Sequence, residues 1–345
     1  MACPNVSSMV ARVAPTMRVT VFFTALVCTA FLMPVTIYLL TKYRIHDVPN
    51  ERSSHQMATI RGTGIAIALG CLAGLFFERG NSASQVLLIC VSAWFGMIGF
   101  IDDLRSLSAK IRLGAQIAGS LIPIIVYNYH YSLDYGPLLI ICGSFGIIAY
   151  VNAFNFMDGV NFISVLQTGV VAISLIVAGN ILHSPLVAIG ASVVLGASIG
   201  FVPFNGIIAK TFMGDVGSYF LGAWLSVLAL LAFKDGSSLI FIVSLGTIYF
   251  SDTGTTLVKR ILRKERWMAA HRQHEFQRLV DMGYSHLFVS LYVTFFSALA
   301  CICGLYSLHS KTPGSVVAFS SMALISVIYL NGHRYHFLTR WAKRS

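Results

Sequence analysis

Long apolar stretches separated by short polar connections dominate the hydrophobicity pattern of this chain. Many are continuous over about 20 residues, the length that a helix needs to cross the hydrocarbon core of a bilayer. A membrane β-barrel would alternate apolar and polar positions instead. The pattern predicts eleven spans, at residues 19–41, 62–77, 85–101, 114–128, 137–154, 162–180, 185–203, 214–233, 237–256, 286–308 and 313–330.

The composition points the same way. Hydrophobic residues make up 56% of the 345 residues and charged residues 11%, and the mean hydropathy is +0.76. A soluble domain carries about 25% charged residues, so a water-soluble globular protein is excluded. The expected fold is all-α, a polytopic membrane bundle of about 10–11 transmembrane helices that forms a single integral membrane domain over residues 1–345.

The basic residues predict the orientation of the chain. Nineteen of the 24 Lys and Arg residues fall in the connections after the odd-numbered spans or in the C-terminal tail. Since Lys and Arg are retained on the cytoplasmic side, we expect the N-terminus outside, the C-terminus in the cytoplasm and a long cytosolic loop at 257–285. The net charge of +11 then reflects topology and attraction to anionic lipid headgroups, so a nucleic-acid partner is not expected.

Four aspartates lie at the ends of spans, all on the predicted cytoplasmic side: Asp102, Asp103, Asp158 and Asp215. A carboxylate at the membrane is costly unless it is paired or coordinated, which favours a functional site. For Asp215 alone, a first-turn acid favoured by the helix dipole is the alternative. Mg2+ commonly binds one or two carboxylates together with substrate phosphates, so it suits the set. Adjacent helical residues point about 100° apart, so we expect Asp102 and Asp103 to have different roles.

A polar stripe precedes the sixth span. Asn152, Asn155 and Asp158 are spaced three apart, which on a helix places them along one slowly drifting face. Amide groups donate and accept hydrogen bonds and could bind a uracil, a ribose or a phosphate. The alternative is hydrogen bonding between helices within the membrane.

The longest cytosolic loop concentrates hydrogen-bond donors. His271, Arg272, His274 and Arg278 could grip a pyrophosphate, with Arg as a planar fork and His as a donor or acid near neutral pH. A zinc site is disfavoured because the loop offers no third Cys or His. The remaining basic residues of this loop are interpreted as anchors of the cytoplasmic side.

The first cytosolic loop contains His55 and ends in Arg61-Gly62-Thr63-Gly64 directly before a span. Backbone amides at a glycine turn before a helix could face a phosphate. On spacing alone, this indication is weak.

Five stretches together carry a family resemblance that covers nearly the whole chain. The chain resembles the polyprenyl-phosphate N-acetylhexosamine-1-phosphate transferase family, and its last cytosolic loop is more similar to the branch that initiates bacterial O-antigen than to the muramoyl-pentapeptide branch. In chain order the stretches are "DVPNERSSH" with "RGTG", "DDLRSLSAKIRLGAQ", "NAFNFMDGVN", "FMGDVGSYFLG" and "AHRQHEFQRL".

The resemblance implies a reaction, a location and a set of site residues. The implied enzyme sits in the bacterial inner membrane with its active site on the cytoplasmic face, is often a homodimer, and depends on Mg2+, with Mn2+ as the alternative ion. It transfers an N-acetylated sugar 1-phosphate from a UDP-sugar to undecaprenyl phosphate and releases UMP, which initiates O-antigen, lipopolysaccharide or a related envelope polysaccharide. The expected catalytic residues are Asp102, Asp103, His271 and His274. The expected metal ligands are Asp215, Asp102 and Asp158, and the expected substrate-binding residues are Asn152, Asn155, Asp158, Arg272, Arg278, Arg61 and His55.

The chain departs from the family pattern at three positions. Ser106 stands where some relatives carry a third acid, Phe162 where they often carry glycine, and Thr63 replaces a common glycine. The first puts in doubt any scheme that needs three acids there, and the others could alter the choice of sugar. The alternative from another class is a polytopic secondary transporter of an anionic solute, although transporters hold their polar residues near the bilayer midplane. The sequence leaves open which sugar is used and whether attack is direct or proceeds through an aspartyl intermediate.

Overall fold

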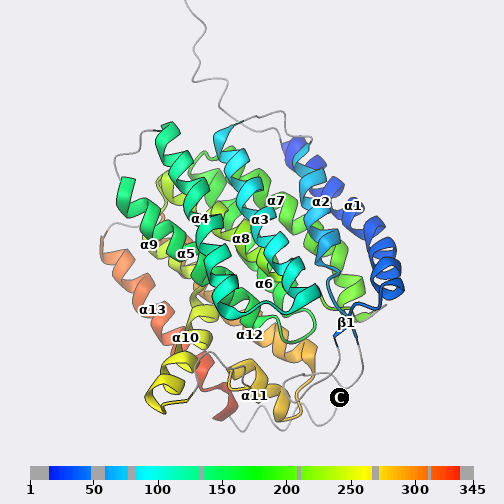
Figure 1. Ribbon diagram of the computed structural model, residues 1–345. Coiled ribbons are helices and arrows are strands. Elements are labelled where there is room, and N and C mark those ends of the chain that lie inside the picture. Colours follow the sequence, from blue (N-terminus) through cyan, green and yellow to red (C-terminus); the bar gives the residue numbers. More distant parts are fainter. Residues whose placement is uncertain are drawn as a thin grey trace, which may run out of the picture.

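The protein is a bundle of helices. The computed structural model describes residues 15–47, 59–76, 82–131, 136–207, 211–265, 272–309 and 312–334 (Figure 1). The helices of the first half are α1 Pro15–Lys42, α2 Gly64–Phe76, α3 Ala83–Arg105, α4 Ala109–Tyr131, α5 Gly136–Met157, α6 Ile163–Ile181 and α7 Pro185–Val202, which continues into a π-helical turn, η2 Pro203–Ile207. Those of the second half are α8 Gly214–Lys234, α9 Leu239–Ser244, α10 Thr247–Leu262, α11 Glu275–Asp281, α12 His286–Ser307, α13 Thr312–Leu330 and a 3-10 turn, η3 Gly332–Arg334.

This architecture confirms the predicted all-α membrane bundle. Each predicted span coincides with a helix, except 237–256, which coincides with the pair α9 and α10. Among the described residues, seven helices are long and apolar enough to cross a membrane, and Gly64–Phe76 and Gly314–Leu330 are apolar but shorter. Counting these shorter helices, α4 and the broken segment as well gives eleven, the upper end of the expected 10–11 spans. The described strands are one antiparallel pair, β1 His46–Asp47 and β2 Thr59–Ile60.

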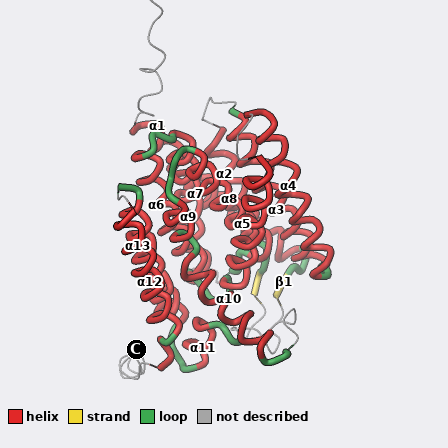
Figure 2. The backbone as a smooth tube through the Cα atoms, turned by 90° about the vertical axis from the view of Figure 1, so that its left-hand side faces the viewer, coloured by secondary structure: helices red, strands yellow, loops and turns green. Residues whose placement is uncertain are grey.

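Helix α8 lies at the centre of the bundle, surrounded by other helices in both backbone views (Figures 1 and 2). It is buried along most of its length, and the indole of Trp224 donates to the carbonyl of Gly190 on α7. Glycines permit close packing here: a Cβ on Gly64 of α2 would collide with the backbone of Gly217 on α8. Small residues at such crossings let membrane helices approach closely.

The predicted ninth span is broken at Leu245 and Gly246, between α9 and α10. A break inside a predicted span needs partners for the freed backbone groups. The Leu245 carbonyl accepts from Gln167 Nε2 at 3.3 Å and from the Tyr150 hydroxyl at 3.5 Å. The buried side chains of neighbouring helices therefore compensate for the interruption.

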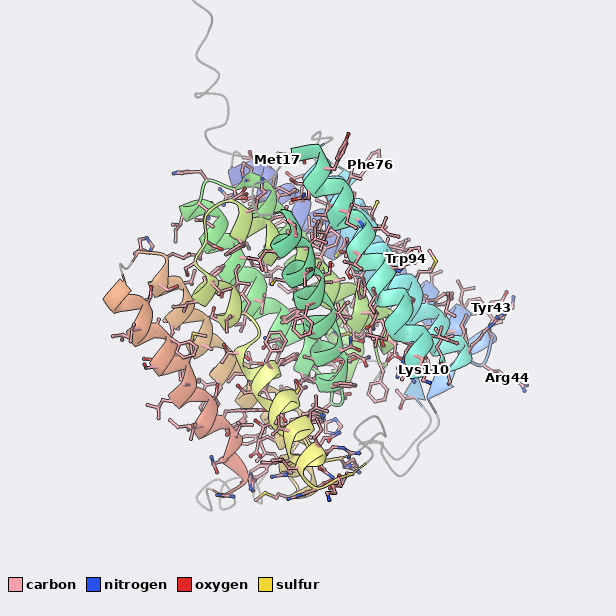
Figure 3. The ribbon with its side chains drawn as sticks, turned by 60° about the vertical axis from the view of Figure 1, so that its left-hand side comes forward. Met17, Tyr43, Arg44, Phe76, Trp94 and Lys110 are labelled. Atoms are coloured by element: carbon pink, nitrogen blue, oxygen red, sulfur yellow. The ribbon has the colours of Figure 1, made fainter. Side chains whose placement is uncertain are left out.

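The two ends of the bundle differ in what they carry. Met17 and Phe76 lie at one end, and Arg44 and Lys110 lie at the other (Figure 3). The short strand β1 and helix α11 lie toward this second end (Figure 1).

Candidate active site

Asp102 lies in the last turn of α3, next to the turn that leads into α4. Its Oδ1 accepts the amide of Leu107 at 2.6 Å, and its Oδ2 is 2.8 Å from Arg112 Nη1 on α4. Ser106 ends α3 in the left-handed conformation, with φ of 48°. Asp102 thus fixes the α3–α4 turn while its carboxylate stays paired with a cation.

Asp103 points to a different helix. Its two oxygens accept the backbone amides of Asp215 and Val216, each at 3.0 Å, and its Oδ1 lies 2.7 Å from Arg61 Nε. The Asp103 side chain is 1% exposed. A carboxylate at a helix N-terminus satisfies free amides and complements the helix dipole. Asp103 therefore caps α8, and the two aspartates do have different surroundings.

Glycines allow this approach. Gly214 has φ of +72°, and a Cβ there would lie 2.5 Å from Asp103 Oδ2. A Cβ on Gly99 of α3 would collide with the backbone carbonyl of Asp215. Helices α3 and α8 therefore meet backbone to backbone at the site.

Asp215 joins the surrounding elements. Its Oδ1 is 2.8 Å from Arg61 Nη2 and accepts from Asn155 Nδ2 of α5 at 2.9 Å. Its carboxyl group is also close enough to interact with both Asp102 and Asp103. Residues from α3, α5, α8 and the segment before α2 therefore converge on one anionic cluster.

The predicted polar stripe divides between two partners. Asn152 donates to Gln116 Oε1 of α4 at 2.8 Å and to its own helix at the Ile148 carbonyl, whereas Asn155 reaches Asp215. Asn155 therefore contacts the carboxylate cluster directly, whereas Asn152 links α5 to α4.

Asp158 follows α5 and accepts the hydroxyl of Ser164 at 2.7 Å. The pKa of Asp158 is raised to about 7, mainly by burial and to a smaller extent by the charge of Asp215, while the hydrogen bond from Ser164 and the charge of Arg61 oppose this rise. These electrostatic effects link Asp158 to the cluster, although the structure gives it no direct contact with Asp215.

The start of α11 packs against the end of α5. His274 is 3% exposed, and its Nδ1 lies 3.1 Å from Asp252 Oδ1 of α10. Its ring stacks with those of Phe156 and Phe276, at centroid distances of 6.5 and 5.7 Å. A Cβ on Gly159 would lie 2.8 Å from the Phe276 ring. The predicted histidine is thus next to the α5–α6 turn, but buried rather than displayed.

The other predicted donors are placed differently. Arg272 forms an ion pair with Asp281 at 2.6 Å, and Arg278 is half-buried on α11. His55 and His271 lie outside the described residues.

Sequence reasoning missed Arg112, Gln116 and Asp252. Arg112 pairs with Asp102, although its place in the sequence indicates only one more basic residue of a polar connection. Asp252 is an acidic residue inside a predicted span, and that rarity alone could have marked it. Gln116 carried no comparable signal.

The donor set fits a hard dication. Asp102 and Asp215 offer carboxylate oxygens close to each other, with Asp158 nearby in electrostatic terms. Across the part of the chain that the structure describes, no group of three or more His, Cys, Asp or Glu is arranged to hold a metal ion. Mg2+ commonly uses one or two carboxylates and takes its other ligands from phosphates and water, so these residues are sufficient for it.

Fold and site together define a multi-pass, all-helical membrane protein whose helix ends converge on an acidic cluster. Residues 85–233 match the model of the family described as Glycosyl transferase family 4. Over this region the chain is similar to this transferase family.

Similar proteins extend the match beyond that region. The chain is 28% identical over 290 residues to a probable undecaprenyl-phosphate N-acetylglucosaminyl 1-phosphate transferase of Bacillus subtilis (strain 168), covering 78% of each chain. It is 27% identical over 292 residues to the phospho-N-acetylmuramoyl-pentapeptide-transferase of Clostridioides difficile (strain 630), covering 74% of this chain and 88% of that protein. The family resemblance drawn from the five motifs is thereby confirmed.

Proposed function

We propose that the protein transfers an N-acetylated sugar 1-phosphate from a UDP-sugar to undecaprenyl phosphate. The products are a polyprenyl-diphosphate-linked sugar and UMP, and the product would initiate O-antigen, lipopolysaccharide or a related envelope polysaccharide. The Bacillus subtilis relative is named for a reaction of this type with N-acetylglucosamine. The observation that carries the proposal is the convergence of Asp102, Asp215 and Arg61 at the ends of separate helices.

The reaction joins two anions, so charge must be neutralised. An oxygen of the lipid phosphate attacks the phosphorus attached to the sugar, and the bond from that phosphorus to the UMP oxygen breaks. When bound, Mg2+, or Mn2+ in its place, would supply charge neutralisation and a better leaving group. Asp215 and Asp102 would hold the ion, with Asp158 as the third proposed ligand.

The residues are proposed to divide the work as follows. Asp102 is proposed to position or deprotonate the lipid phosphate, whereas Asp103, whose oxygens accept two amides of α8 and pair with Arg61, is proposed to hold α8. The resemblance implies a catalytic role for both aspartates, and this proposal keeps direct contact with the lipid phosphate for Asp102. Direct attack is preferred over an aspartyl intermediate, since a phosphate dianion is itself a nucleophile.

The donor nucleotide is proposed to lie between the polar end of α5 and the last cytosolic loop. Asn155 and Asp158 would face it from α5, with Asn152 supporting that helix through Gln116. Arg61, Arg272, Arg278 and His55 are proposed as phosphate or sugar contacts, and His271 and His274 as hydrogen-bond donors or acids at the diphosphate.

A panel of radiolabelled UDP-sugars tests the proposal. Protein purified in detergent is incubated with undecaprenyl phosphate and Mg2+, and lipid-linked product and UMP are both measured. We expect equal amounts of the two products with at least one UDP-N-acetyl sugar. Solute uptake by proteoliposomes without UMP release from any UDP-sugar would overturn the enzyme in favour of a transporter. The proposed setting is the cytoplasmic face of the bacterial inner membrane, with a homodimer as the expected assembly.

A further inference from the structure

A second polar cluster is centred on Asp252 of α10. Its side chain is 1% exposed and lies within one of the predicted spans. Carboxylates inside membrane helices are rare and require partners. No role proposed above uses this residue.

The partners of Asp252 come from two other helices. Its oxygens accept the backbone amide of Glu275 on α11 at 3.0 and 3.1 Å, and the hydroxyl of Tyr329 on α13 at 2.7 Å. The remaining contact is the 3.1 Å approach of His274 Nδ1 to Oδ1. The charge of the carboxylate therefore meets an imidazole ring at the start of α11.

This contact restricts the His274 ring. A carboxylate only accepts hydrogen bonds, so the proton must reside on Nδ1 for the contact to be favourable. Stacking on Phe156 and Phe276 limits rotation of the same ring. In the neutral ring, Nε2 then carries the lone pair, as in other pairs where a carboxylate orients a histidine.

We infer that Asp252 is a positioning residue for His274, holding the ring in one tautomer and orientation through the Oδ1 to Nδ1 contact. Asp252 touches no substrate, and it acts on the reaction only through His274. The inference rests on the proposed function, which gives His274 its role at the diphosphate of the donor. Tyr329 and the Glu275 amide keep the carboxylate itself in place.

The central experiment compares Asp252→Asn with His274→Gln and with the double variant. Asparagine keeps the size of the side chain but no longer enforces a proton on Nδ1. We expect kcat for UMP release to fall about 10- to 100-fold, below the roughly 10²–10⁴-fold that a general acid or base contributes. The KM for the UDP-sugar should change little. In the H274Q background, D252N should cause no further fall in kcat, because residues that act as a unit are not additive.

Tyr329→Phe is the matched control. It removes a hydrogen bond to the same carboxylate but leaves the contact with His274, so kcat should stay within about twofold of wild type. If Y329F lowers kcat as much as D252N, or if D252N lowers kcat further in the H274Q background, Asp252 is merely structural and the inference fails. Should D252N not fold, Asp252→Glu, which keeps the charge, should retain part of the activity lost in D252S. A folded D252E no more active than D252S would overturn the inference.

Failure of the inference is distinguishable from failure of the proposed function. If the wild-type protein releases no UMP from any UDP-sugar, the proposed function itself is wrong. If the wild-type protein is active and H274Q retains its kcat, only the role of His274, and with it that of Asp252, is wrong.

Discussion

Asp102 and Asp103 are neighbours in sequence but belong to different parts of the site. Asp102 pairs with Arg112 and the amide of Leu107, whereas Asp103 binds Arg61 and the first amides of α8. The second set contains the beginning of the central helix. Loss of charge should therefore mainly affect the stability of the fold at Asp103 and the turnover of the enzyme at Asp102.

We expect Asp103→Asn to lower the free energy of unfolding by about 1.5–3 kcal/mol, because hydrogen bonds to a charged acceptor are replaced by weaker ones. Asp102→Asn should lower stability less, since the Arg112 side chain is 33% exposed and such pairs are screened. D102N should nevertheless lose the larger share of turnover. The unfolding midpoint in detergent and the rate of UMP release measure the two effects. Equal stability losses in both variants would contradict this division.

Among the elements, α3 and α8 can pack closely together because Gly99 of α3 has no side chain. Gly99→Ala should cost about 1–3 kcal/mol through overpacking against the Asp215 carbonyl, and it should lower turnover because Asp215 moves. Gly146→Ala in α5 is the matched control, because an added Cβ there meets nothing within 4 Å. This control should be neutral or stabilising by about 0.5–1 kcal/mol. Similar unfolding midpoints for G99A and G146A would show that the helices can separate without loss.

The short helix α11 is tied to the turn after α13 by Glu275. Its carboxylate accepts the backbone amide of His333 at 2.7 Å and lies 2.8 Å from His333 Nδ1. Burial raises the pKa of Glu275 above its usual range, although the contacts with His333 oppose this effect. The folded state therefore binds the proton more tightly than the unfolded state does.

This shift predicts a pH dependence. The stability contributed by protonation of Glu275 is fully present below its ordinary pKa and is lost as the pH rises through the raised value of the folded protein. Glu275→Gln should make the unfolding midpoint less dependent on pH in that window. Unfolding curves recorded across the acidic range for both proteins test this, and parallel curves would assign the pH dependence to other groups.

In the whole molecule, segments between residues 61 and 215 come together in one acidic cluster. The arginines of this cluster are already paired with its aspartates, so they leave no excess positive charge to neutralise two phosphorylated substrates. Chelation with EDTA should therefore reduce UMP release to background, because repulsion between lipid phosphate and diphosphate is no longer offset. Added Mg2+ should restore the rate, and Mn2+ should restore at least part of it. Full activity after exhaustive chelation would contradict the proposed ion, while an unchanged unfolding midpoint would show that EDTA acts on the reaction and not on the fold.

The helices could be predicted because the bilayer demands long apolar segments, and ten of the eleven stretches coincide with one helix each, while 237–256 coincides with the pair α9 and α10. The convergence of Asp102 and Asp215 also followed, since both lie at helix ends on the same predicted side. The capping of α8 by Asp103 could not be predicted, because the partner amide of Asp215 is 112 residues away in the chain. The contact of Asp252 with His274 also depends on a tertiary approach that spacing does not encode.

The interruption at Gly246 separates α10 from α9. In α10 several polar side chains are buried and several apolar side chains are exposed. Asp252, Thr256 and Arg260 are buried at intervals of four, while Leu257, Ile261 and Leu262 are exposed. A peptide of this segment alone would be poorly suited to water, because it carries an apolar face, and poorly suited to hydrocarbon, because it carries ionisable residues. We expect an amphipathic helix of this kind to favour the boundary between acyl chains and headgroups, with its apolar face toward lipid and its ionisable residues toward the protein.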